Sequence, residues 1–297
     1  MRIILTGAAG FLGREIAREL RARGHRVAGM RRRLDGQSPD DFIGDFLVPE
    51  SYRASFRNFA PDILIHCGWH GVPARSRDLL DQLDNVPAAV RLAEAGADAG
   101  AKLVIGLGTQ AEYGAYDHLV REDEIGQPVT LYAIAKLAAG QAFLRVAKQK
   151  KIRGIWARIF SLYGPRETAP SMLPWLAREF AAGQVPSLTA CTQVWDFLHV
   201  RDGARAIADL AESHGAEGVF NVASGEAPLL RDTVLHLRDL MAKQIEPDFG
   251  SVPFGPDQIM YLAGNIAKLQ EATGWHPRIS MAEGLAELAE EARQSLE

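Results

Sequence analysis

The residues that could do chemistry in this chain centre on one tyrosine, one lysine and one threonine. Tyr132 and Lys136 are four residues apart in a run of strong helix formers, so both side chains should lie on one helix face. A nearby ammonium group would favour the phenolate and lower the tyrosine pKa, which suits proton transfer. Thr109 follows an apolar run of strand length, where its hydroxyl could hydrogen-bond a substrate oxygen. The three residues predict proton transfer at a substrate oxygen.

A glycine-rich segment near the start of the chain predicts a dinucleotide site. Glycines occupy positions 7, 10 and 13, between a first apolar run and a helix-like stretch. This spacing gives a tight turn, close approach of the backbone to a pyrophosphate, and close packing of helix on strand. The following helix would direct its free N–H groups at the phosphates. The cofactor-binding residues expected here are Gly7, Gly10, Phe11, Leu12 and Gly13.

The residues after the second expected strand, 26–30, indicate which dinucleotide is bound. An acidic side chain there would hydrogen-bond the ribose of NAD, but the chain has arginines and no acid before Asp35. Arginine suits the 2′-phosphate of NADP, although a run of arginines can also form an ordinary basic turn. The sequence favours NADP(H) over NAD(H), with Arg31 and Arg32 as phosphate-binding residues.

Short apolar runs alternate with helix-like stretches over about the first 165 residues. Several runs are continuously apolar, as expected of strands buried on both faces. This alternation is typical of βαβ units that build a parallel sheet covered by helices on both faces. It predicts an α/β fold with a doubly wound parallel sheet of the Rossmann type. The expected strands are Arg2–Thr6, Arg26–Met30, Asp62–Cys67, Lys102–Leu107, Gly154–Ile159 and Val219–Ala223.

The C-terminal part is less regular, and clustered prolines punctuate it. We expect the segments around 197–200 and 219–223 to be strands that rejoin the main sheet. We therefore expect a smaller lobe that is interleaved with the larger one. The cofactor domain would comprise residues 1–165 and about 195–225, and the substrate-binding lobe about 166–194 and 226–297.

The composition excludes several classes of protein. The 297 residues carry a formal net charge of −4, which argues against a nucleic-acid partner. Two cysteines cannot make a disulfide framework, and they lack zinc-site spacing, so no metal is expected. We expect no signal peptide, and the chain has no apolar run of membrane-spanning length. We expect a cytoplasmic protein with no membrane partner.

Further motifs follow in a defined order along the chain. Together with the glycine segment and the Tyr-x-x-x-Lys pair, they resemble the extended short-chain dehydrogenase/reductases of the NAD(P)-dependent epimerase/dehydratase family. The resemblance spans nearly the whole chain, and most members of that family act on nucleotide-linked sugars. It implies that Tyr132 is the catalytic acid/base, that Lys136 also holds the nicotinamide ribose, and that Thr109 fills the Ser/Thr role. The motifs are His66–Trp69, Asp84–Val86, Arg158–Pro165, Val194–Asp202 and Phe220–Gly225.

Binding residues follow from the same resemblance and from their places at expected strand ends. On the cofactor side they are Asp45, Phe46, Cys67, Gly68, Trp69, Asn85, Lys136 and Phe160, of which Asp45 and Phe46 could address the adenine ring. On the substrate side they are His70, Thr109, Ser161, Arg166, Gln193, Asp196 and His199.

The residues after Thr109 limit the reactions that the site is expected to catalyse. Relatives that eliminate water or decarboxylate a sugar carry an acid directly after this position or two residues after it, whereas this chain has Gln110 and Ala111. Glu112 is acidic but lies one position beyond the acid of the decarboxylating relatives. Along an extended segment its side chain would therefore point to the opposite side from that acid. Hydride transfer assisted by one tyrosine then leaves two reactions, reduction of a keto-sugar or epimerisation at C4.

We expect an NADPH-dependent reductase of a nucleotide-linked 4-keto-(6-deoxy)hexose. The alternative is a C4-epimerase of a nucleotide sugar with permanently bound NAD. A third reading, a non-catalytic module that senses NADP(H), is disfavoured because the chain keeps Thr109, Tyr132 and Lys136 together. Family members commonly pair the tyrosine helix with its neighbour, so the resemblance also implies a homodimer.

Overall fold

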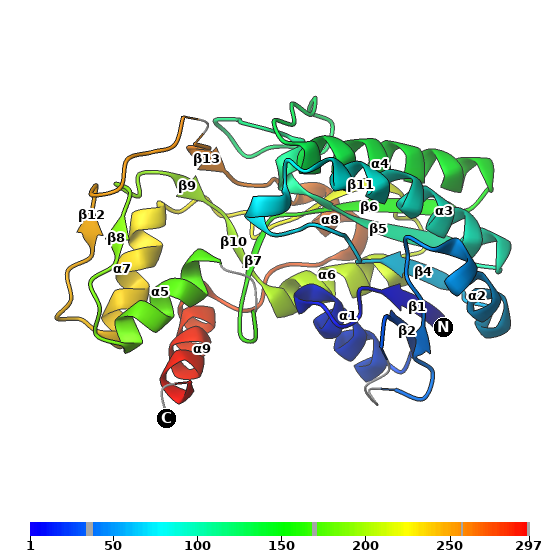
Figure 1. The fold of residues 1–297 in the computed structure, drawn as a ribbon, viewed down its shortest axis with the longest axis horizontal. Helices are drawn as coiled ribbons and strands as arrows, with labels where there is room; N and C mark the ends of the chain where they lie inside the picture. The colour runs from blue at the N-terminus through cyan, green and yellow to red at the C-terminus, as the bar shows by residue number, and fades with distance from the viewer. Residues whose placement is uncertain (34–37, 168–170, 257, 296–297) are drawn as a thin grey trace.

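The computed structural model describes residues 1–33, 38–167, 171–256 and 258–295 (Figure 1). Its largest element is a seven-stranded parallel sheet in the order β11-β6-β5-β4-β1-β2-β3. The predicted Rossmann-type α/β fold is confirmed, and the expected strands differ from the observed ones by one or two residues at their ends. The strands are β1 (Arg2–Thr6), β2 (Arg26–Arg31), β3 (Phe42–Ile43), β4 (Ile63–His66), β5 (Leu103–Thr109), β6 (Arg153–Ile159) and β11 (Gly218–Val222).

Helices cover both faces of the sheet, as Figure 1 shows. Side chains alternate along a strand, so Ile3 and Leu5 of β1 pack on one face and Ile4 packs on the other. The helices over the first face are α1 (Phe11–Ala22), α6 (Val200–Glu212) and α8 (Ala267–Thr273). Those over the second face are α2 (Arg53–Phe59), α3 (Asn85–Asp98) and α4 (Leu131–Gln149). Both layers of the core are fully apolar, which holds the strand ends in fixed positions.

A second group of helices packs around its own apolar core, beside the carboxyl ends of the central strands. Its helices are α5 (Met172–Ala181), α7 (Leu230–Met241) and α9 (Met281–Gln294). Short strand pairs lie around it: β7 (Ser161–Tyr163) with β10 (Phe197–His199), β8 (Ser187–Leu188) with β12 (Asp248–Phe249), and β9 (Val194–Trp195) with β13 (Tyr261–Leu262). Among the helices of the described residues, none has the length and hydropathy needed to cross a membrane.

Two segments differ from the expected organisation. Of the two expected returns to the main sheet, Gly218–Val222 pairs with β6, but Phe197–His199 pairs with β7 outside that sheet. Helix α8, expected in the substrate lobe, instead buries Leu269 in the core over the central sheet. Sequence periodicity could not reveal either difference, because both depend on which partner covers an apolar face. The division of the chain into two domains stays a prediction.

The strand order places a site at one edge of the sheet. β1 lies between β2 and β4, so the chain runs outward from β1 in both directions. In open α/β sheets, ligands bind outside the carboxyl ends of the strands at such a switch point. The residues that follow β1, β4 and β5 therefore meet at the same place.

Candidate active site

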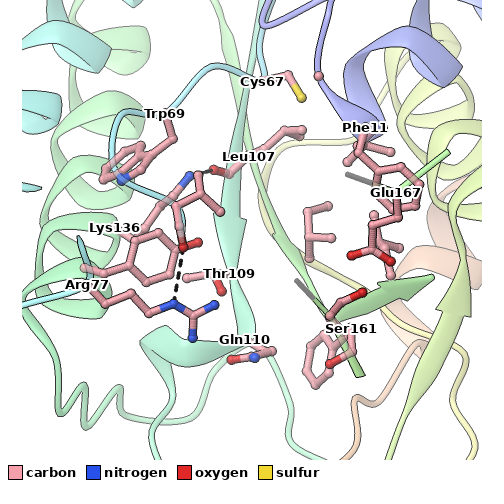
Figure 2. A pocket seen from close by; sticks show the side chains of 18 of the residues that line it. Phe11, Cys67, Trp69, Arg77, Leu107, Thr109, Gln110, Lys136, Ser161 and Glu167 are labelled. Atoms are coloured by element: carbon pink, nitrogen blue, oxygen red, sulfur yellow. Dashed lines mark hydrogen bonds between the residues drawn. The ribbon is translucent and has the colours of Figure 1, made fainter. Parts of the chain in front are cut away.

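A large cavity lies at the carboxyl ends of the central strands. Its volume is about 1180 Å³, more than the roughly 300–1,000 Å³ of ordinary small-ligand sites, so it can hold a dinucleotide and a second ligand. The glycine segment lines one end, and residues of α5 and α7 line the other. Thr109, Tyr132 and Lys136 all line the part between. Figure 2 shows Trp69 and Lys136 on one side of this space and Glu167 on the other.

The glycine segment has the backbone geometry of a phosphate cradle. Gly7 has a φ of +69°, and a Cβ there would lie 2.7 Å from the backbone nitrogen of Gly68. A Cβ on Gly13 would collide with the carbonyl of Gly7, so α1 packs directly against the turn. Gly10 begins α1 without a side-chain cap, which leaves the first N–H groups of the helix to meet an anion. Phe11 and Leu12 also line the cavity, and the segment fits a dinucleotide pyrophosphate.

The ends of β1 and β4 are tied together beside this cradle. The Oγ1 atom of Thr6 lies 2.8 Å from Nδ1 of His66 and accepts a hydrogen bond from the backbone nitrogen of Gly68. Burial, assisted by the charge of Lys136, lowers the pKa of His66 to about 3, so the ring is neutral. Burial also raises the pKa of Cys67 to about 12, so its thiol packs as a small apolar group. Cys67 and Gly68 line the cavity through this arrangement.

An acid that the sequence did not reveal lies beside the end of β2. Asp35 is outside the described residues, but Asp41 accepts hydrogen bonds from Arg31 Nε at 2.6 Å and from the backbone nitrogen of Gly29 at 2.8 Å. A guanidinium nitrogen of Arg21 also lies 3.3 Å from the same carboxylate. The side chain of Asp41 is 2% exposed, so these partners occupy it and a ribose cannot reach it.

Four residues expected to bind the cofactor line the cavity near the end of β2. Arg31 lines it, but its guanidinium is largely buried against Asp41, whereas Arg32 is exposed and lines the cavity as well. Asp45 also lines it and accepts a hydrogen bond from the backbone of Leu47. The ring of Phe46 packs near His66, with ring centroids 5.4 Å apart. Of the two arginines expected to meet a phosphate, Arg32 is the more accessible.

Tyr132 lies at the start of α4, opposite the end of β5. Thr130 caps the helix by accepting a hydrogen bond from Ala133, which fixes where the first turn begins. Burial raises the pKa of Tyr132, while hydrogen bonding to Thr109 and the charge of Arg77 act to lower it. The expected lowering of the Tyr132 pKa is wrong for this structure, because burial outweighs the groups that lower it. A protonated tyrosine at neutral pH suits the role of proton donor.

Lys136 is held by two other partners. Its Nζ atom donates a hydrogen bond to the carbonyl of Leu107 at 2.6 Å and lies 3.9 Å from the ring centroid of Trp69 (Figure 2). Burial lowers its pKa to about 8, and the carboxylate of Glu112 opposes that effect. Trp69 also packs edge-on against Tyr132, with ring centroids 6.2 Å apart. The indole therefore forms a wall that the side chains of Tyr132 and Lys136 both contact.

Two buried amides shape the loop that carries this indole. Gln82 accepts a hydrogen bond from Trp69 Nε1 at 2.9 Å and donates one to the carbonyl of Gly71 at 2.7 Å. Asn85 accepts a hydrogen bond from the backbone nitrogen of His70 at 2.8 Å and donates to its carbonyl. Asn85 was expected to bind the cofactor, but it is fully buried and does not line the cavity. Its role is to hold the loop, and His70 does line the cavity.

Glu112 faces away from the cavity, although the reason differs from the expected one. The segment Gln110–Glu112 is a short 3₁₀ turn rather than an extended one, and Thr109 and Glu112 form a capping box. The carboxylate of Glu112 accepts hydrogen bonds from Trp156 Nε1 at 3.0 Å and from Arg158 Nε at 2.8 Å. It is completely buried, so it serves the geometry of Thr109 and not the substrate.

The substrate end of the cavity contains only some of the expected residues. Phe160, Ser161 and Gln193 line it, and Ser161 Oγ accepts a hydrogen bond from Trp195 Nε1 at 2.9 Å. Glu167, which the sequence analysis missed, also lines it (Figure 2), and burial raises its pKa to about 7. No spacing pattern marks this acid, so only the packing of the lobe reveals it.

Three residues expected to meet substrate lie outside the cavity lining. Asp196 is fully buried and accepts hydrogen bonds from the backbone of Ser224 at 2.8 Å and from two glycines, so it joins three segments of backbone. His199 caps α6 by accepting a hydrogen bond from the nitrogen of Arg201. Arg166 is exposed, and its backbone nitrogen donates to Glu291. None of the three lines the cavity, and their role in substrate binding stays a prediction.

The chain is similar to a known family and to characterised relatives. The family described as "NAD dependent epimerase/dehydratase family" matches residues 3–223. The dTDP-6-deoxy-L-talose 4-dehydrogenase (NAD(P)(+)) of Kitasatospora kifunensis is 27% identical, over 97% of this chain and 94% of that protein. The GDP-6-deoxy-D-mannose reductase of Pseudomonas aeruginosa is 29% identical, over 96% and 94% respectively.

A solved structure supports the same assignment. The UDP-glucose 4-epimerase of Thermus thermophilus, determined in complex with NAD, superposes with a TM-score of 0.85 over 99% of both chains and is 25% identical. The cradle at Gly7 and the set of Thr109, Tyr132 and Lys136 agree with a nicotinamide-dependent enzyme of this kind. The chain belongs to the NAD dependent epimerase/dehydratase family and is an NAD(P)-binding oxidoreductase of the extended short-chain dehydrogenase/reductase type.

Proposed function

We propose that the protein reduces a nucleotide-linked 4-keto-(6-deoxy)hexose with NADPH. The observation that carries the proposal is the meeting of Thr109, Tyr132 and Lys136 in one cavity with the glycine cradle. When bound, the nicotinamide supplies the hydride for the carbonyl carbon. Tyr132 donates its proton to the carbonyl oxygen, and the Thr109 hydroxyl steadies the charge that develops there. Burial raises the pKa of Tyr132, so the residue carries the proton that it donates in the reduction.

The residues behind Thr109 support this reaction over elimination or decarboxylation. Ala111 offers no acid or base, and Glu112 is fully buried against Arg158. The remaining alternative is a C4-epimerase with tightly bound NAD, and one relative in the comparison carries that activity by name. A nucleotide sugar is proposed as the substrate because the two sequence relatives are named for deoxyhexoses linked to dTDP and to GDP.

The cofactor content of the purified protein separates the two reactions. A reductase is expected to leave the column without bound nicotinamide and to oxidise added NADPH only when a 4-keto sugar nucleotide is present. An epimerase is expected to retain NAD, visible by absorbance and in a denaturing extract. Retained NAD together with interconversion of C4 epimers would replace the proposal by its alternative.

Arg32 is proposed to set the preference for NADPH. It lines the cavity and is exposed, so an added 2′-phosphate has an arginine within reach, and Asp41 is not available to bind a ribose. Replacing Arg32 with Ala is expected to raise the Kd for NADPH about tenfold and to leave NADH within about twofold. Quenching of protein fluorescence by each cofactor measures both constants.

Neighbouring arginines provide the controls for this prediction. Arg33→Ala changes an exposed residue outside the cavity lining and is expected to leave both constants unchanged. Arg31→Ala is a poorer test, because it also removes a buried partner of Asp41 and so destabilises the fold. An equal loss of NADPH and NADH affinity in Arg32→Ala would refute the proposed role.

We also propose a homodimer formed on the α3–α4 side. Large apolar side chains are exposed there: Leu79, Leu80, Leu83 and Ile134, of which Leu80 is 73% exposed. Ile134 belongs to the helix that carries Tyr132, and the leucines lie in the loop packed against that helix. Exposed apolar side chains gathered on neighbouring elements favour burial against a second copy. The mass of the protein in solution, measured by light scattering, tests this assembly.

A further inference from the structure

Arg77 is a cavity residue that no sequence motif marks. It lies in the loop between β4 and α3, which is built around the buried amides of Gln82 and Asn85. Figure 2 shows its side chain extending toward Thr109 and Gln110. The loop therefore places a permanent positive charge on the wall of the cavity, on a residue that is otherwise exposed.

The loop is fastened to the first turn of the catalytic helix. The backbone nitrogen of Tyr132 donates a hydrogen bond to the carbonyl of Arg77 at 2.7 Å. The next nitrogen back, that of Leu131, donates to Oδ1 of Asp78 at 3.0 Å. These two N–H groups belong to the helix end that has no internal partners, so the loop caps it. Any shift of Arg77 relative to Tyr132 would break this contact.

The side chains of the pair are also in contact. The guanidinium carbon of Arg77 lies 5.3 Å from the centroid of the Tyr132 ring, and its Nε donates a long hydrogen bond to the carbonyl of Val72 at 3.4 Å. The terminal nitrogens of Arg77 form no hydrogen bond or ion pair with any described residue. The cation therefore faces Tyr132 without a carboxylate that would neutralise it.

The other charges around Tyr132 come from three directions. On α4, the ammonium of Lys136 is directed to the carbonyl of Leu107 and the face of Trp69. Behind Thr109, the carboxylate of Glu112 opposes formation of a phenolate, although Arg158 pairs with it. In the loop, Asp78 is engaged by the start of the helix. His70 and Glu167 line the same cavity. Among these groups, Arg77 is a cation that contacts the Tyr132 ring, and its charge favours the phenolate.

We propose that Arg77 is a positioning residue that stabilises the phenolate left on Tyr132 when it gives up its proton. The inference rests on the proposed reduction. In that step the O–H bond of Tyr132 breaks and a new O–H bond forms on the substrate oxygen, while the hydride of NADPH completes the C–H bond. The negative charge then resides on the phenolate of Tyr132, whose ring centroid lies 5.3 Å from the guanidinium carbon of Arg77. The same contact would favour the phenolate that accepts a proton in the reverse reaction.

The ionisation of Tyr132 tests this role without any substrate. The titration is followed by tyrosinate absorbance. For the wild type and for each Arg77 variant, the absorbance of the same protein carrying Tyr132→Phe is subtracted, which leaves the signal of Tyr132. Replacing Arg77 with Gln is expected to raise the midpoint by about one pH unit, because an opposite charge at this range shifts a pKa by about one unit or more. Arg77→Lys is expected to keep most of the wild-type midpoint. Arg75→Gln, an exposed arginine of the same loop, is expected to leave it unchanged.

The pH dependence of the rates of ketone reduction and of alcohol oxidation gives the second measurement. Arg77→Gln is expected to slow alcohol oxidation about tenfold at neutral pH and to move its rising pH limb to higher pH. The falling limb of ketone reduction should move the same way. Damage to folding alone would lower both rates without moving either limb. An unchanged Tyr132 midpoint in Arg77→Gln would overturn the role of Arg77, whereas absence of turnover with every 4-keto sugar nucleotide would overturn only the proposed function.

Discussion

Replacing Tyr132 with Phe is expected to reduce the rate of NADPH oxidation by about a thousandfold. The change removes only the hydroxyl, so the substrate oxygen loses its proton donor. The ring remains, and with it the edge-on contact with Trp69 and the stacking of Arg77. NADPH affinity should therefore stay within about twofold of wild type, since the cradle at Gly7 is unchanged. Single-turnover oxidation of NADPH and fluorescence titration of the cofactor measure the two quantities.

Tyr116 provides the matched control. Its hydroxyl donates a hydrogen bond to the carbonyl of Ile125 outside the cavity, so Tyr116→Phe also loses one tyrosine hydroxyl and one hydrogen bond. This control should keep turnover close to wild type. A Tyr132→Phe enzyme that retains more than about a tenth of the wild-type rate would show that another group donates the proton.

Replacing Glu112 with Gln is expected to lower the free energy of unfolding by about 3 kcal/mol. The carboxylate is 0% exposed, and its partner Arg158 has a side chain 7% exposed, so the substitution leaves a buried guanidinium without its counter-charge. Glu112 also accepts hydrogen bonds from the backbone nitrogen of Thr109 and from Trp156. A loosened Thr109 should reduce turnover too, although Glu112 does not touch the cavity. Urea denaturation, with the slope of the transition checked for constancy, measures the stability loss.

A double variant separates the charge from the packing. Combining Glu112→Gln with Arg158→Met removes both charges, and it is expected to recover part of the lost stability because no buried ion remains unpaired. A loss below about 1 kcal/mol in Glu112→Gln would mean that water reaches Arg158, contrary to its burial. Equal stability of the single and double variants would argue against an unpaired charge as the cause.

Local pattern in the sequence was enough for the sheet and the cofactor cradle. Strands such as Leu103–Thr109 are continuously apolar because helices cover both faces, and that pattern is visible without any partner. The glycines at 7 and 13 are required by contacts within one short turn, so their spacing predicts their role. The helical spacing of Tyr132 and Lys136 likewise placed both in the cavity.

Residues that act through distant partners could not be predicted in this way. Asn85, Asp196 and His199 occupy expected motif positions, but each is engaged by backbone groups and lies outside the cavity lining. Asp41 reaches the end of β2 from a later segment, where it pairs with Arg31. A polar side chain in a motif looks the same in sequence whether it binds a ligand or satisfies buried backbone, since the difference depends on what packs around it.

The sequence by itself was enough to predict the alternation of strands and helices in the central sheet, the cradle for a dinucleotide, and the placing of Tyr132 and Lys136 together in the cavity. These properties depend on residues within a few positions of one another, whose spacing alone fixes their relative geometry. Only the tertiary structure decided which charges surround Tyr132. Asp78 meets the start of α4 across 53 residues of chain, with Arg77 beside it, and Lys136 turns to the carbonyl of Leu107, 29 residues away. Such contacts arise from packing of the sheet and the loop, and no local spacing encodes them.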